Sequence, residues 1–233
     1  MKKLLISFFV FFTILANAVD VNTYIPKNAV PLLPVLKEEI KNYDAKNEYP
    51  WYYGGLIEQE SCAALTTKQC WSATAQLKTS RERGVGLGQI TVAYNPDGSV
   101  RFDSLSDLRK AHMKELHDLS WSNVVQRPDL QIRSIIIMSE SNYSEFYDVK
   151  DNYQRQAMTD IAYNAGSGRV RKDRQLCSLT KGCDPGIWFD STEKYCTASK
   201  KPIYGNRSAC DIMNEHANNI FKLRMEKYKP YLQ

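Results

Sequence analysis

The sequence of 233 residues lacks the features that would place it in a membrane or on nucleic acid. After the first 18 residues, no apolar run approaches the roughly 20 residues that a membrane-spanning helix needs. No basic stripe alternates with aromatic side chains, so the usual footprint of a nucleic-acid-binding surface is missing. No internal repeat and no low-complexity linker divides the chain. We therefore expect a soluble globular protein with no nucleic acid partner and no stable membrane span.

Metal ligands are also scarce. The chain has three histidines and no Cys-x-x-Cys pair, whereas structural zinc sites are usually built from closely spaced cysteines and histidines. Two of the histidines, His112 and His117, are five residues apart, which does not place them on one face of a helix. We therefore expect no metal site and no cofactor.

The first 18 residues are typical of a secretory signal. Lys2 and Lys3 give a basic start, residues 4–15 form an apolar run, and residues 16–18 form a small-x-small cleavage site. An uncleaved anchor is the alternative. Cleavage would leave 215 residues and would lower the net charge from +5 to +3. We expect an exported protein, either periplasmic or secreted.

All six cysteines follow this signal, which favours disulfide bonds in an oxidising compartment. Six cysteines can pair in many ways. The simplest arrangement joins neighbours: Cys62–Cys70, Cys177–Cys183 and Cys196–Cys210. Each such bridge would contribute about 2–3 kcal/mol to stability.

Hydrophobic periodicity and end signals predict a mostly α-helical chain with few and short strands. The expected helices span residues 35–43, 51–61, 104–119, 128–147, 151–164 and 208–228. In the last of them His216 falls on an apolar, core-facing stripe, and Pro230 closes the helix. Segments with turn signals are expected to be irregular at 62–78, a turn or hairpin at 94–102, and loops in the Cys-rich segment 177–210. Residues 19–50 are expected to form an N-terminal extension packed on a catalytic domain spanning 51–233.

Glu60 stands at the end of the apolar segment that begins at Trp51. A carboxyl group in such a site is shielded from water, and shielding favours its protonated form. A protonated carboxyl group can donate its proton to a poor leaving group such as a glycosidic oxygen. The alternative is an ordinary surface glutamate.

Three segments resemble the ordered motifs of the soluble lytic transglycosylase family. They are Glu60-Ser61, residues 86–90 (Gly-Leu-Gly-Gln-Ile) and residues 162–166 (Ala-Tyr-Asn-Ala-Gly), all within about 110 residues. In the family these motifs read roughly Glu-Ser, Gly-Leu-Met-Gln-Ile and Ala-Tyr-Asn-Ala-Gly. The resemblance covers roughly residues 51–170, and the tail beyond resembles a more divergent branch, phage-type or specialised.

The resemblance implies a lysozyme-like helical fold, with a cleft between the helix of Glu60 and the helix that ends at Tyr163. It makes Glu60 the catalytic acid. It also implies that Ser80 and Gln89 contact polar groups of the substrate, that Tyr163 is an orienting hydroxyl near Glu60, and that Asn164 lies in the cleft. The implied partner is the glycan strand of peptidoglycan, and we expect a monomer.

The sequence departs from the family in three places. Gly88 stands where the family has methionine, Ser80 lies further from Glu60 than usual, and the insertion at 62–78 is expected to reshape one wall of the cleft. The related goose-type lysozymes carry an aspartate where this chain has Thr91. Without that second carboxylate, the resemblance implies cleavage of the MurNAc-β-1,4-GlcNAc bond by Glu60 alone, which leaves 1,6-anhydroMurNAc and consumes no water.

Two alternatives stay open at the level of sequence. Glycosidases that add water generally use two carboxyl groups, about 5–5.5 Å apart in retaining enzymes and about 6.5–9.5 Å apart in inverting ones. If Glu82 points into the cleft, hydrolysis becomes an option, and the chain could be a peptidoglycan hydrolase (muramidase or endolysin) that uses a second carboxylate. Otherwise we expect Glu82 to be solvated. The second alternative is a wall-binding component that keeps the fold without catalysis.

Overall fold

The computed structural model describes residues 19–233, so the predicted secretory signal lies outside the described residues. Within residues 19–233 helices predominate, which confirms the mostly α class. The α-helices are α1 (Leu33–Tyr43), α2 (Tyr52–Ser61), α3 (Ser104–Ala111), α4 (Met113–Leu116), α5 (Pro128–Glu145), α6 (Asn152–Ala165), α7 (Ser167–Ser178), α8 (Ala209–Asn219) and α9 (Lys229–Leu232). Between Val19 and Gln233, no helix combines the length and the apolar character that crossing a membrane requires.

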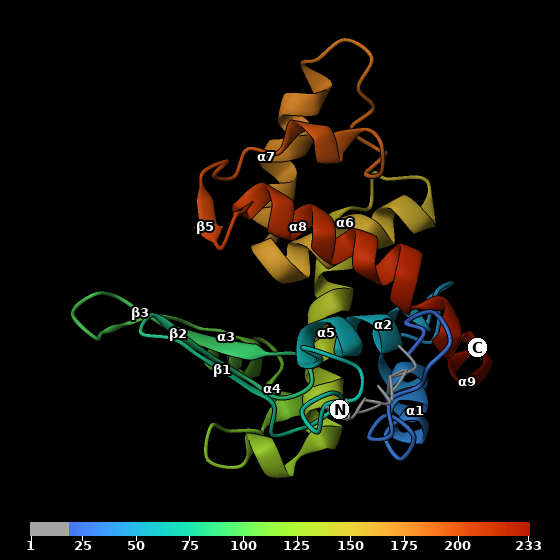
Figure 1. Ribbon diagram of the computed structural model, residues 1–233, viewed down its shortest axis with the longest axis vertical. Coiled ribbons are helices and arrows are strands. Elements are labelled where there is room, and N and C mark those ends of the chain that lie inside the picture. Colours follow the sequence, from blue (N-terminus) through green and yellow to red (C-terminus); the bar gives the residue numbers. More distant parts are fainter. Residues whose placement is uncertain (1–18) are drawn as a thin grey trace, which may run out of the picture.

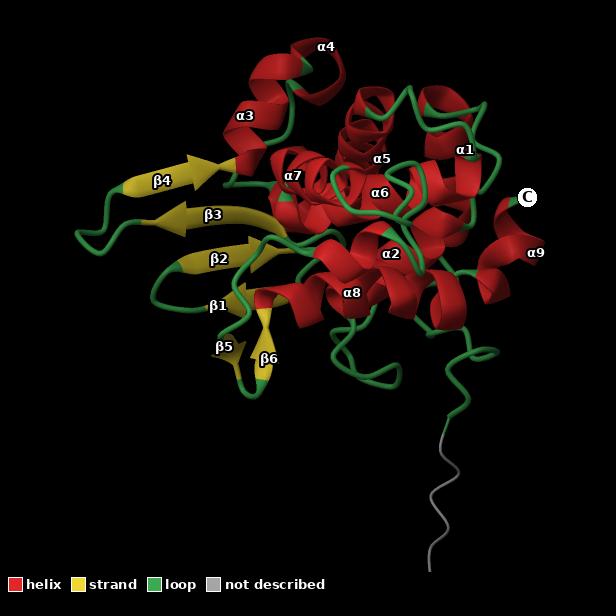
Figure 2. Ribbon diagram, turned by 90° about the horizontal axis from the view of Figure 1, so that it is seen from above, coloured by secondary structure: helices red, strands yellow, loops and turns green. Residues whose placement is uncertain are grey.

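A four-stranded antiparallel sheet projects from this helical body (Figures 1 and 2). Its strands follow one another in sequence order: β1 (Gln76–Lys78), β2 (Glu82–Val85), β3 (Ile90–Tyr94) and β4 (Val100–Asp103). The predicted hairpin at 94–102 is confirmed as the β3–β4 hairpin of this sheet. The prediction was wrong for the supposedly irregular segment 62–78, which ends in β1. Strands β1 and β4 are mostly exposed and only three and four residues long, so their alternation of apolar and polar residues is too short to mark a strand in sequence.

Helix α5 joins the two halves of the structure. Ile135 and Ile136 belong to the large helical core, whereas Ile137 packs in a smaller cluster with Val85 and Ile90 of the sheet. Each buried isoleucine contributes about 1.5–3 kcal/mol to the stability of the fold. Because one helix anchors both cores, it fixes the position of the sheet relative to the helical body.

The N-terminal extension shares the large core. Leu33, Leu36 and Ile40 of α1 are buried in it. Arg133 of α5 donates to both carboxylate oxygens of Glu39, each at 2.8 Å. Such a paired contact of guanidinium and carboxylate fixes orientation as well as distance. Helix α1 is thereby held along α5.

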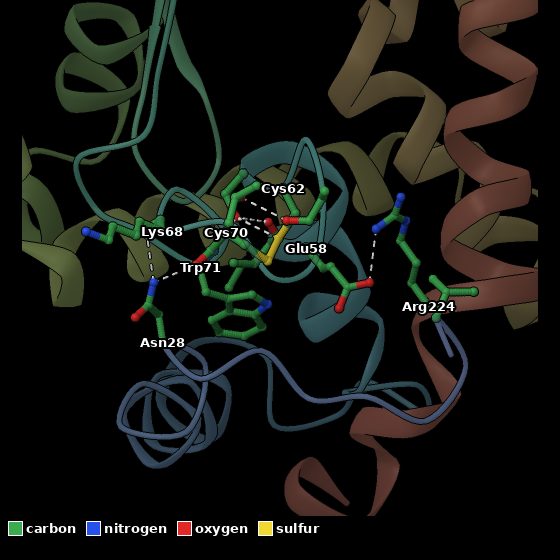
Figure 3. Close-up of a disulfide and its surroundings, with 12 residues drawn as sticks. Asn28, Glu58, Cys62, Lys68, Cys70, Trp71 and Arg224 are labelled. Atoms are coloured by element: carbon green, nitrogen blue, oxygen red, sulfur yellow. Dashed lines mark hydrogen bonds and ion pairs between the residues drawn. A yellow bond between two sulfur atoms is a disulfide. The ribbon is translucent and has the colours of Figure 1, made fainter. Parts of the chain in front are cut away.

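The cysteines pair as neighbours, in the simplest arrangement that the sequence allows: Cys62–Cys70, Cys177–Cys183 and Cys196–Cys210. The first bridge closes the loop that follows α2, and Asn28 donates to the carbonyls of Lys68 and Cys70 in that loop at 3.2 and 2.9 Å (Figure 3). Helix α7, which carries Cys177, was not predicted. Gly166, with φ of +85°, ends α6 and immediately precedes α7. A glycine at this place is the usual signal for the end of a helix, so the start of α7 directly after it was missed.

The predicted last helix, 208–228, is interrupted. Helix α8 ends at Asn219 and passes into a π-helical turn, η3 (Ile220–Arg224), and then into a 3-10 turn, η4 (Glu226–Tyr228). Pro230 lies in the first turn of α9 rather than closing a helix. The buried side chains of Ile220, Met225 and Tyr228 are spaced by five and then three residues, matching the hydrogen bonds from Met225 N to Ile220 O and from Tyr228 N to Met225 O.

This interrupted segment packs closely on α2, at a place where α2 has two glycines. A Cβ atom on Gly54 would lie 2.4 Å from Cγ of Tyr228, and one on Gly55 would lie 3.0 Å from Cβ of Met225. No ordinary side chain fits at the first position. The Gly54-Gly55 pair therefore permits the contact that holds α2, and with it Glu60, against the C-terminal segment.

Candidate active site

A cavity of about 1060 Å³ lies between the sheet and the helices α2, α5 and α6. Four of the predicted site residues line it together: Glu60, Gln89, Tyr163 and Asn164. Ser80 does not. It is exposed in the connection between β1 and β2, and the structure does not bring it to the other four.

The disulfide loop after α2 forms one end of this cavity. Cys62, Ala63 and Thr67 belong to the lining, so this loop forms part of the wall. Ser61 ties the loop to the helix, because its Oγ donates to Ile57 O at 2.6 Å and accepts from Trp71 N at 3.0 Å. Here Ser61, beside Glu60, stabilises the end of the helix.

The Glu60 side chain is 14% exposed and faces the cavity from the last turn of α2. One of its oxygens, Oε1, lies 2.6 Å from Nε2 of His216 on α8. The other ring nitrogen, Nδ1, lies 2.8 Å from Oδ2 of Asp160 on α6, and the hydroxyl of Tyr52 donates to Oδ1 of Asp160 at 3.0 Å. Glu60 is thus the cavity end of a buried hydrogen-bonded chain that runs through His216 and Asp160 to Tyr52.

Burial alone would lower the pKa of His216, but the charge of Asp160 and hydrogen bonds to Asp160 and Glu60 outweigh burial and raise it to about 10. The imidazole therefore carries a proton on both nitrogens at neutral pH and donates to both carboxyl groups. Burial, then the charge of Asp160, also raises the pKa of Tyr52 well above its ordinary value, so its hydroxyl stays a donor.

Sequence reasoning missed this partner of Glu60. His216 does lie in the core, as its apolar stripe predicted, and only 5% of its side chain is exposed. The available signal was the residue type itself, because a titratable ring on a buried stripe needs polar partners. Nothing local identified those partners as Glu60 and Asp160, 156 and 56 residues away.

The glycine-rich turn between β2 and β3 supports the opposite wall. Gly86 has φ of +84°, and a Cβ atom there would lie 2.1 Å from Oε1 of Gln131. That buried oxygen accepts from Leu87 N at 2.8 Å and so anchors the turn to α5. Gln89 has φ of +46°, and its Nε2 donates to Gly86 O at 2.9 Å. The side chain predicted to contact substrate also stabilises the turn that carries it.

The side chain of Tyr163 on α6 contacts this turn. Its hydroxyl donates to Gly88 O at 2.8 Å, and no hydrogen bond joins it to Glu60. Burial, with smaller contributions from the charges of Glu60 and Asp160, raises the pKa of Tyr163 well above its ordinary value. Tyr163 is therefore near Glu60, as the resemblance implies, but its hydroxyl positions the turn instead of the carboxyl group.

Gly88 has no room for the methionine that the family carries there. A Cβ atom would lie 2.5 Å from both Cγ1 of Ile135 and the hydroxyl of Tyr163. A methionine is nevertheless present at the cavity, because Met138 on α5 lines it. The apolar surface that Gly88 does not offer is thus available from the neighbouring helix.

We expect Gly88→Ala to destabilise the protein by about 1–3 kcal/mol, because the added methyl group overpacks the contact between the turn and Tyr163. Any activity of the site should fall by about 10- to 100-fold, because the wall shifts relative to Glu60. Urea denaturation and an activity assay measure the two effects.

Gly168→Ala is the matched control for this substitution. A Cβ atom at Gly168 would meet only the end of the flexible Arg171 side chain, at 3.8 Å, and Gly168 does not line the cavity. Equal effects of the two substitutions would show that crowding at Gly88 is not their cause.

Glu82 enters the cavity, contrary to the expectation that it is solvated. It is half-buried on β2 and lines the cavity together with Gly84, two residues further along the strand and on the same face. Glu60 and Glu82 are the acidic residues of the described lining. The site therefore presents one carboxyl group from a helix and one from the sheet.

Among residues 19–233, no group of three or more histidine, cysteine, aspartate or glutamate side chains is arranged to hold a metal ion. The chemistry that the cavity residues offer is proton transfer by carboxyl groups in a cavity lined by hydrogen-bonding side chains.

Compared with protein-family models, curated proteins and solved structures, the chain matches none of them.

Proposed function

We propose that this protein is a peptidoglycan lytic transglycosylase with a lysozyme-like fold. The observation that carries the proposal is the placement of Glu60: its carboxyl group is largely shielded, faces a large cavity, and is held at one oxygen by a buried partner. The three disulfides fit an exported enzyme that reaches the cell wall. The choice of peptidoglycan as the substrate rests on the resemblance of the three ordered motifs to those of the soluble lytic transglycosylase family.

The reaction needs one group that first gives and then takes a proton. Glu60 protonates the oxygen between N-acetylmuramic acid and N-acetylglucosamine while the bond from C1 to that oxygen breaks. The C6 hydroxyl of the same muramic acid then attacks C1, and the Glu60 carboxylate accepts the hydroxyl proton. The product is a 1,6-anhydro sugar, Glu60 has its proton again, and water is not consumed.

The other cavity residues supply binding and orientation. Asn164 and the amide oxygen of Gln89 offer hydrogen bonds to sugar hydroxyl and acetamido groups, and Met138 offers an apolar surface. Thr91 does not replace a catalytic aspartate, because its hydroxyl donates to Gln89 O at 2.7 Å. Precise placement of this kind accounts for a large part of catalysis when the chemistry is only proton transfer.

Glu82 favours a second candidate function. A carboxylate across the cavity from Glu60 could activate water or stabilise the glycosyl cation, and the protein would then be a muramidase. A third possibility is a wall-binding protein that does not cleave. The products distinguish the three functions.

The test is mass spectrometry of the soluble muropeptides released from purified peptidoglycan. We expect products that are lighter by one water than hydrolysis products and that resist reduction by borohydride. Reducible muramoyl ends would establish the muramidase. Binding to walls without release of muropeptides would establish the wall-binding protein.

A further inference from the structure

We propose that His216, oriented by Asp160, is a positioning residue for Glu60: it fixes which carboxyl oxygen faces the substrate and stabilises the carboxylate that Glu60 becomes. The inference rests on the proposed function in one respect, that Glu60 is the acid of a glycosidic cleavage. It assigns roles to two residues outside the motifs of the sequence.

The geometry fixes the imidazole ring on both sides. Nε2 contacts Glu60 at 2.6 Å, and Nδ1 contacts Asp160 at 2.8 Å. Asp160 is fully buried, and its second oxygen accepts from Tyr52. With both oxygens of Asp160 and both ring nitrogens engaged, the ring has one orientation, and the hydrogen bonds need no water.

This arrangement divides the two oxygens of Glu60 between different tasks. Oε1 of Glu60 is hydrogen-bonded to His216, while the Glu60 side chain lines the cavity. The second oxygen, Oε2, is therefore the one presented to the substrate. Because a proton-transfer group must lie within hydrogen-bond reach of its target, fixing Oε1 fixes the direction of the transfer.

The titratable groups around His216 come from two elements packed against α8. Glu60 and Tyr52 belong to α2, and Asp160 belongs to α6, which also carries Tyr163 near Glu60. The charge of Asp160 balances the charge of the protonated ring. The Asp160–His216 pair is thus neutral overall, and it places a hydrogen-bond donor without net charge beside Glu60.

The hydrogen bond from His216 strengthens as the reaction proceeds. When Glu60 gives its proton to the glycosidic oxygen, the neutral carboxyl group becomes a carboxylate, and its bond to the imidazolium becomes charge-assisted on both sides. An interaction that is stronger after proton transfer than before it lowers the barrier. His216 keeps both of its protons, and the C6 hydroxyl returns the proton to Glu60.

The first test uses His216→Gln and Asp160→Asn, each assayed over a range of pH. We expect kcat to fall by about 10- to 100-fold while KM changes by less than about twofold, because substrate contacts remain. In His216→Gln we also expect the alkaline limb of the pH profile of kcat/KM to move to higher pH, because the carboxylate of Glu60 no longer has its charged donor. His117→Gln, at an exposed histidine, is the matched control and should change neither quantity.

A second test uses the wild-type protein, so it does not depend on whether a variant folds. In the wild-type protein labelled with ¹⁵N at histidine, the ring of His216 should stay protonated on both nitrogens at pH 7 and should titrate near pH 10. A neutral His216 ring at pH 7 would overturn the proposal. So would folded variants that keep both kcat and the wild-type pH profile.

The outcomes separate this inference from the proposed function. Anhydro products with an unshifted pH profile in both variants would reject the role of His216 and leave the lytic transglycosylase standing. Reducible muramoyl products with a shifted profile would reject the lytic transglycosylase and keep His216 as the residue that positions Glu60.

Discussion

Glu60→Gln should lower the release of soluble muropeptides by about 100- to 10,000-fold, the range that a general acid–base group contributes. The amide has nearly the same shape as the carboxyl group. Its oxygen can still accept from Nε2 of His216, which lies 2.6 Å from Oε1 in the wild type. The fold should therefore survive, while the proton that leaves with the glycosidic oxygen is lost.

Glu82→Gln is the control for this substitution, because it makes the same chemical change on the opposite wall of the same cavity. In a lytic transglycosylase it should cost less than about tenfold, as expected for a group that does not transfer the proton. If both substitutions abolish release, two carboxyl groups are needed, as in a muramidase. If Glu60→Gln stays active and folded, Glu60 is not the acid.

Glu58→Ala should lower the free energy of unfolding by about 3–5 kcal/mol, the cost of removing one partner from a buried ion pair. Glu58 lies two residues before Glu60 on α2 and is fully buried. Its carboxylate accepts from Lys227 Nζ at 2.9 Å, Arg224 Nη1 at 3.0 Å (Figure 3) and the Tyr228 hydroxyl at 2.5 Å. Without it, the buried Lys227 and the half-buried Arg224 lose the carboxylate that both contact.

Lys227 shows how strongly this cluster depends on Glu58. Burial lowers the pKa of Lys227, while the hydrogen bond and the charge of Glu58 act in the opposite direction. Removing Glu58 leaves mainly the unfavourable effect, which the protein relieves by deprotonating the lysine or by unfolding locally. Urea denaturation monitored by tryptophan fluorescence suits the measurement, because Trp71 donates to the Tyr228 hydroxyl at 3.0 Å within the cluster.

Glu38→Ala is the matched control, since Glu38 is exposed and forms only a surface pair with Lys41. Such pairs contribute about 0–1 kcal/mol. The double substitution Glu58→Leu with Lys227→Met should recover part of the stability, because it removes charge from both sides of the pair. A change below about 1 kcal/mol in Glu58→Ala would show that the cluster does not stabilise the fold.

The sequence predicted those features whose cause is local. The helices predicted at 128–147 and 151–164 and the pairing of neighbouring cysteines each depend on residues that are close in the sequence. The same holds for Glu60, Gln89, Tyr163 and Asn164, which were recognised by short motifs. The motifs also named Ser80, but the insertion between it and Glu60 leaves it in an exposed connection away from the cavity.

The remaining features depend on contacts that sequence patterns do not encode. Strands β1 to β4 are only three to five residues long, too short for a periodic pattern to stand out in the sequence. The π-helical turn follows from close packing of Met225 and Tyr228 on the two glycines of α2. Glu82 looked like a solvated charge because its strand was not recognised, and the face of that strand decides its position. His216 and Asp160 belong to the site only because the fold packs α8 and α6 next to the end of α2 that carries Glu60.

The two carboxyl groups of α2 depend on a part of the chain that is synthesised long after them. Glu60 binds His216, and Glu58 binds Arg224 and Lys227, partners that lie 156, 166 and 169 residues later. During translation α2 thus emerges before the partners of both glutamates have been made, and Glu60, the proposed acid, does not yet have the imidazole of His216 beside it. The site is therefore built last, by the closure of the C-terminal segment over α2. A chain still being made, or one without this segment, holds the motifs of the enzyme without its assembled catalytic carboxyl group.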